Sequence, residues 1–281
     1  MSNRKYYSTR TGKNPDASLY DLPILLRLFS DFYLEFLNKD YFQEDFGYLC
    51  EDAGEVSGKL GSDIEAQMFR AIRKPDLWPI QQKFKSYSED DLFDVIEFLY
   101  DHVSKPIDGY CHTYCGYHYN TFDKKTGQQE FRDGISQILC DYKEGYELSD
   151  DGEILESPEQ GLENLFAASL PTHDPDNVEQ RVQAAILKFR RYRSSLEERR
   201  NAIRDLADVL EFLHPQLKTV ITKKDERDLF GIANQFGIRH HNDQQKQDYD
   251  KAIWYSWMFY YYLATIHACL HLIKKAESQS P

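Results

Sequence analysis

The stretch from Ser195 to Leu213, SLEERRNAIRDLADVLEFL, decides the fold of the C-terminal part of the chain. Ser195 and Glu198 have the spacing of a capping box, in which two side chains satisfy free backbone N–H groups at a helix start. Apolar residues then recur at helical spacing, at Ile203, Leu206, Leu210 and Leu213. The pattern predicts an amphipathic helix with one buried face, and Pro215 is expected to end it.

Similar patterns occur on both sides of this stretch. Asp176 is expected to cap a preceding helix, and Thr222 a following helix that ends before Gly237. Asn242 or Asp243 is expected to cap the last and longest helix, which runs to about Lys275. Four helices with short connections predict a helical bundle over residues 176–281.

The N-terminal part also favours helices. Asp21 is expected to cap a helix to about Leu37, and Ser88 is expected to cap a second, whose apolar positions have helical spacing. Residues 63–72, 78–87 and 128–142 are further helix candidates, whereas residues 38–62 are expected to be mostly loop. Asp151-Gly152 between two apolar runs predicts a β-hairpin. We therefore expect a mainly α protein, with an N-terminal helical domain over residues 1–156 that includes this small hairpin, a proline-containing linker over 157–175, and the C-terminal bundle.

Composition narrows the function classes. The 281 residues are 41% hydrophobic and 29% charged, so a packed core is expected and wholesale disorder is not. A formal charge of -13 excludes nucleic-acid binding through the whole surface, so any such contact must be local. The polar start and the low, odd number of five cysteines favour a cytoplasmic protein with reduced thiols.

The segment from Ala252 to Ile273 carries no Asp, Glu, Lys or Arg and is long enough to span a bilayer. Tyrosines lie at its centre, where a membrane helix would place aliphatic residues. A buried helix of a soluble bundle is the better interpretation, and we expect no membrane contact.

A dense set of metal-capable side chains lies between Cys111 and His118. Cys111, Cys115 and His118 could supply three ligands, with Cys50 or Cys140 as a fourth. The spacing matches no common zinc signature, so we interpret the segment as an aromatic loop and assign no metal and no other cofactor.

The run from Lys188 to Arg200 is the basic stretch of this acidic chain, and Phe189 and Tyr192 are interleaved with its charges. Arginine forks suit phosphate and aromatic rings suit unpaired bases, so the run is a candidate RNA contact. The alternative is a solvated helix face paired with nearby acids. The candidate residues are Lys188, Arg190, Arg191, Arg193, Arg199 and Arg200.

Arg239, His240 and His241 lie at the expected junction before the last helix. An arginine can stabilise charge on a phosphate, and an imidazole can exchange protons with a ribose 2′-hydroxyl. These groups are sufficient for metal-free RNA cleavage. A structural role, with Asn242 as a cap and the histidines filling a corner, is the alternative.

The helix order over about residues 176–275, with Arg239 followed by a polar residue before the last helix, resembles the HEPN superfamily of bacterial toxins and abortive-infection (antiphage) proteins. FRDGISQIL (131–139) and GYELSDDGEIL (145–155) are similar to N-terminal domains of the AbiJ type. The resemblance implies a metal-independent endoribonuclease that is active as a homodimer through the bundle.

In the family motif, a histidine follows the arginine after four to six residues. Gln244, Gln245 and Lys246 stand at those positions here, so the motif is incomplete. Arg239 matches the arginine and His240 the polar residue after it, and His241 could replace the motif histidine only with a different geometry. Arg239, His240 and His241 are the catalytic candidates. HEPN-like bundles without activity bind RNA or proteins, and this noncatalytic role is the alternative. A third hypothesis is a zinc-stabilised binding module built on Cys111 to His118.

Overall fold

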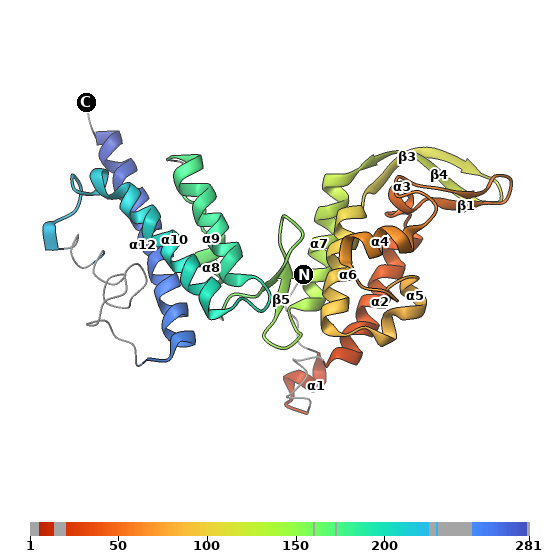
Figure 1. Cartoon of the computed structure of the whole chain (residues 1–281), viewed down its shortest axis with the longest axis horizontal. Coiled ribbons are helices and arrows are strands. Elements are labelled where there is room, and N and C mark those ends of the chain that lie inside the picture. Colours follow the sequence, from red (N-terminus) through yellow and green to blue (C-terminus); the bar gives the residue numbers. More distant parts are fainter. Residues whose placement is uncertain are drawn as a thin grey trace. The chain divides into compact units, whose positions relative to one another are not determined.

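A computed structural model describes residues 6–13, 21–159, 161–171, 173–224, 229 and 249–279. The chain forms two compact units, Met1–Ser157 and Pro158–Pro281. Each unit consists mainly of helices, and the described strands form small antiparallel hairpins in the first unit (Figure 1). The predicted mainly α class is therefore confirmed.

The longer helices of the first unit, those of nine residues or more, begin at a side-chain cap. Asp21 accepts a hydrogen bond from the backbone N–H of Ile24 at 3.0 Å, and Ser88 forms a capping box with Asp91. The helices are α1 (Tyr7–Arg10), α2 (Leu22–Asn38), α3 (Gln43–Phe46), α4 (Ile64–Ile72), α5 (Ile80–Lys83), the 3-10 turn η1 (Phe84–Ser86), α6 (Glu89–His102) and α7 (Lys124–Leu139).

An aromatic core joins α2 to α7. The Phe131 ring lies 5.2 Å from that of Phe32 and 5.4 Å from that of Phe36, between ring centroids. Gly134 lets the two helices approach, because a Cβ at this position would lie 2.5 Å from the Phe32 ring. Each fully buried side chain of this kind stabilises the fold by about 1.5–3 kcal/mol relative to exposure.

Three hairpins complete the first unit. They are β1–β2 (Tyr48–Cys50 and Gly54–Val56), β3–β4 (Lys105–His112 and Gly116–Asp123) and β5–β6 (Tyr146–Leu148 and Ile154–Glu156). The third hairpin confirms the prediction from Asp151-Gly152. The other two were not expected: β1–β2 lies within a predicted loop, and β3–β4 contains the segment interpreted as an aromatic loop.

The second unit contains α8 (Glu163–Ala167), the π-helical turn η2 (Pro175–Glu179), α9 (Gln180–Arg190), α10 (Leu196–Leu217) and α12 (Lys251–Gln279). The Ser195–Glu198 capping box of α10 is confirmed. Two local expectations are wrong. Asp174, not Asp176, caps the first turn by accepting from the Asn177 N–H at 3.1 Å. Pro215 lies inside α10, which continues to the buried Leu217.

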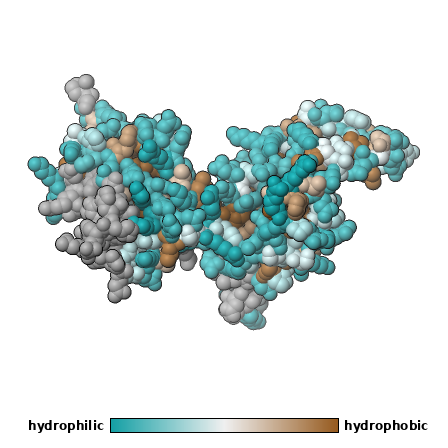
Figure 2. Space-filling model, in the orientation of Figure 1, coloured by the Kyte–Doolittle hydropathy of each residue, from teal (hydrophilic) through white to brown (hydrophobic). Residues whose placement is uncertain are grey.

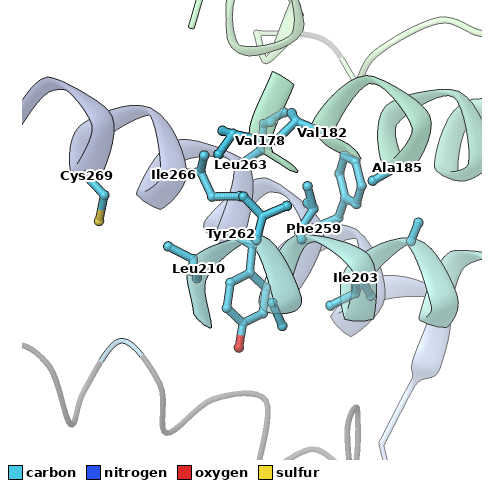
Figure 3. Close-up of a cluster of buried hydrophobic side chains, with 14 of the residues drawn as sticks. Val178, Val182, Ala185, Ile203, Leu210, Phe259, Tyr262, Leu263, Ile266 and Cys269 are labelled. Carbon is cyan, nitrogen blue, oxygen red and sulfur yellow. The ribbon is translucent and has the colours of Figure 1, made fainter. Parts of the chain in front are cut away.

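Helices α9, α10 and α12 enclose one hydrophobic core (Figure 3). The rings of Phe189 and Phe259 stack with centroids 4.0 Å apart. Tyr255 and Tyr262 of the last helix are buried in this core. None of the described helices combines the length and apolarity that crossing a bilayer requires. The expected start of the last helix, Asn242 or Asp243, lies outside the described residues, as does most of the helix expected after Thr222.

Candidate functional site

The basic run lies at the corner between α9 and α10, in the second unit. Arg193 adopts a left-handed backbone conformation with φ of 54°, which turns the chain before Ser195 caps α10. The Arg193 guanidinium lies 4.9 Å from the centre of the Tyr192 ring. Arg191 and Arg193 are exposed, and Arg200 is half-buried. The corner therefore presents cationic and aromatic groups together.

Three other residues of the run pack into the unit itself. Arg190 is only 7% exposed and its guanidinium lies 4.9 Å from the Phe166 ring centre. Arg199 lies in the same way over Phe189, at 5.3 Å. Lys188 forms an ion pair with Asp205. These contacts fit the structural alternative for the three residues, of which Arg190 is buried and Lys188 and Arg199 are half-buried.

The predicted catalytic residues Arg239, His240 and His241 lie outside the described residues. Their roles therefore stay predictions.

A second cluster of reactive side chains lies in the first unit. The ligand atoms of Cys50, His112, Cys115 and His118 all lie within 4.8 Å of one another. Cys50 ends β1, His112 ends β3, Cys115 lies in the turn after β3, and His118 lies on β4. Two hairpins that are distant in sequence thus bring two thiols and two imidazoles to one point.

Strand register explains which residues of the segment converge. Successive residues of a strand point to opposite faces, so Tyr110 and His112 share a face of β3 while Cys111 points the other way. The hairpin pairs Tyr110 with His118 and His112 with Gly116, so both histidines lie on that face. Cys111 and Cys140, which the sequence analysis offered as ligands, are exposed and lie outside the cluster. His112 belongs to the cluster although it is not among the ligands predicted from the sequence.

Hydrogen bonds from the backbone surround the two sulfur atoms. The Glu51 N–H donates to Cys115 Sγ at 2.9 Å, and the two sulfurs lie 3.4 Å apart. Hydrogen bonding from the Ala53 backbone holds the pKa of Cys50 below its ordinary value, whereas burial raises the pKa of Cys115. A cation at this point would favour the thiolate form of both residues.

No family model, no curated protein and no solved structure matches this chain.

Proposed function

We propose that this protein is a bacterial defence protein of the abortive-infection type whose HEPN-like C-terminal bundle contacts RNA. The observation that carries the proposal is the α9–α10 corner, where exposed Arg191 and Arg193 flank Tyr192. Guanidinium groups bind phosphate, and an aromatic ring beside them offers a platform for an unpaired base. In a chain with a formal charge of -13, such a local surface is the form that RNA binding must take.

The more specific proposal is that the bundle cleaves RNA. Two copies of the chain, paired through the bundle in the cytoplasm, would bring Arg239, His240 and His241 to one RNA strand. One imidazole would take the proton of a ribose 2′-hydroxyl, and Arg239 would stabilise the charge that develops on the phosphate. The alternative is a noncatalytic bundle that binds RNA or a protein. The resemblance supports both forms.

Binding and cleavage are tested separately. Fluorescence anisotropy with labelled single-stranded RNA is expected to show weaker binding for Arg191→Glu/Arg193→Glu than for the wild-type protein. Lys124→Glu/Lys125→Glu makes the same charge change at exposed positions of the first unit and is the matched control. Equal losses of RNA affinity in both variants would show that only net charge matters, and would contradict RNA binding at this surface.

For cleavage, wild-type protein and Arg239→Ala are incubated with RNA in the presence of a chelator. Cleavage by the wild type, lost in the variant at an unchanged melting temperature, supports the endoribonuclease. RNA binding without cleavage supports the noncatalytic alternative.

A further inference from the structure

The strongest feature of the first unit outside the proposed RNA surface is the cluster of Cys50, His112, Cys115 and His118. The distances between its ligand atoms suit one small cation. Cys50 Sγ lies 3.4 Å from Cys115 Sγ and 3.9 Å from His112 Nδ1. Ligands of a tetrahedral zinc ion, at about 2.0–2.3 Å from the metal, are themselves separated by about 3.3–3.8 Å. The four side chains therefore need small adjustments to surround one ion.

His118 provides an independent indication of a missing partner. The side chain is only 4% exposed, and its Nε2 atom is buried with no hydrogen-bond partner among the described residues. Its other nitrogen, Nδ1, faces the Tyr110 hydroxyl at 3.3 Å, and its ring packs against Tyr48. A buried polar atom without a partner destabilises the fold, and a metal bond at Nε2 would remove that cost.

His112 has the environment of a metal ligand as well. Its Nδ1 faces Cys50, while its Nε2 lies 3.0 Å from a carboxylate oxygen of Asp52. Histidines that bind metals commonly donate the second ring N–H to a carboxylate or carbonyl, which fixes the tautomer and the ring orientation. In each histidine, one ring nitrogen has a polar neighbour outside the cluster, Asp52 for His112 and Tyr110 for His118, which leaves the other nitrogen for a metal.

We propose that Cys50, Cys115, His112 Nδ1 and His118 Nε2 bind one Zn²⁺ ion. Two thiolates and two neutral imidazoles compensate the ion's charge and match the mixed sulfur–nitrogen tetrahedral set that zinc favours. The protein supplies all four ligands, so no coordination position is open for a substrate or an activated water. The site is structural, and it is independent of the proposed RNA contact.

The ion would join two hairpins that are individually small. β1–β2 has three residue pairs, and two-stranded hairpins are marginally stable on their own. Cys50 and Cys115 are separated by 65 positions in the sequence, so a bond through zinc closes a long loop. The metal would fix the β3–β4 turn on the β1–β2 turn.

The test begins with the full-length protein, purified without a metal-binding tag and analysed by elemental mass spectrometry. About one zinc per chain is expected. Cys50→Ser and Cys115→Ser are expected to lose most of that zinc. Cys111→Ser is the matched control, since it removes an exposed thiol from the same hairpin and should retain the metal.

A second measurement does not depend on the folding of a variant. Wild-type protein is stripped with a chelator and reconstituted with Co²⁺, which reports coordination through its absorption spectrum. Intense visible bands of a tetrahedral ion, together with a thiolate charge-transfer band, are expected. Zinc far below one per chain in the purified wild type, a six-coordinate cobalt spectrum, bound iron–sulfur in place of zinc, or equal metal loss in Cys111→Ser would each overturn the assignment.

Discussion

The Nε2 atom of His112 lies 3.0 Å from Oδ2 of Asp52, and the opposite ring nitrogen faces the sulfur of Cys50 at 3.9 Å. One imidazole therefore links an acidic residue of the β1–β2 turn to the thiol at the end of β1. This arrangement favours the tautomer with the proton on Nε2, which leaves the Nδ1 lone pair directed at the cluster. Asp52 thus acts on the proposed zinc ion through His112, as a positioning residue.

Replacing Asp52 is expected to weaken zinc binding without abolishing it. Losing such an orienting partner commonly lowers metal affinity by about 10–100-fold, and we expect about tenfold for Asp52→Ala because this side chain is 78% exposed. The measurement is competition with a chromogenic chelator. Glu55→Ala removes an exposed acid from the same hairpin and is the control. An equal loss in both variants would show that only local charge matters.

Metal removal is expected to loosen the hairpins and leave the helices intact. Amides of residues 48–56 and 105–123 should exchange hydrogen faster after chelation, because their cross-link is lost. Helix α7 should remain protected, since Phe131, Ile135 and Leu139 are fully buried. Hydrogen exchange read by mass spectrometry gives both results in one sample, and α10 in the second unit serves as an internal reference. Unchanged exchange in the hairpins would contradict a structural role for the ion.

Much of the helical fold was predictable because its signals are local. Asp21, Ser88 and Ser195 each cap a helix within three residues of their own position, so the start of α2, α6 and α10 can be read directly. Glycine disfavours helices, and Gly134 lies inside α7. The structure shows what this glycine contributes: close contact with the Phe32 ring across the helix pair.

The cluster of Cys50, His112, Cys115 and His118 could not be predicted from spacing alone. Its two sulfurs are 65 positions apart, and their contact depends on how the first two hairpins pack. Reading Cys111 and Cys115 as a pair assumed that both side chains point the same way. The β3–β4 register instead selects His112 and excludes Cys111. Side chains alternate between the two faces of a β-hairpin, so a predicted hairpin would have indicated His112 in place of Cys111. The sequence analysis predicted no hairpin in this aromatic segment.

The capping box of α10 makes a prediction about stability and its pH dependence. Ser195→Ala should lower the free energy of unfolding of the second unit by about 1 kcal/mol, as is usual for a lost N-terminal cap. Hydrogen bonds from the Ser195 hydroxyl and backbone hold the pKa of Glu198 below its ordinary value. Its contribution is therefore complete above the unfolded-state pKa and is lost as pH falls through the lower folded-state value.

Glu198→Gln should consequently flatten the acid side of the stability curve relative to the wild type. Urea unfolding between pH 3 and pH 7 measures the effect. Ser88→Ala, which removes the corresponding cap of α6, should leave the unfolding of the second unit unchanged. A curve for Glu198→Gln that parallels the wild type at all pH values would rule out this carboxylate as the source of the acid dependence.

Arg190 and Arg191 are adjacent at the end of α9, but replacing them is expected to have different effects on stability and on RNA binding. Arg190 is buried over the Phe166 ring, so Arg190→Ala removes packing and a cation–π contact worth about 0.5–2 kcal/mol. Arg191→Ala alters an exposed side chain and should change the free energy of unfolding by less than about 0.5 kcal/mol.

Under the RNA proposal, Arg191→Ala should instead weaken RNA binding and reduce the dependence of binding on salt. Denaturation and anisotropy titrations at two salt concentrations, made on both variants, separate the two roles. If Arg191→Ala lost stability and kept its RNA affinity, the exposed arginines of this corner would have an architectural role, and the RNA surface would have to lie elsewhere.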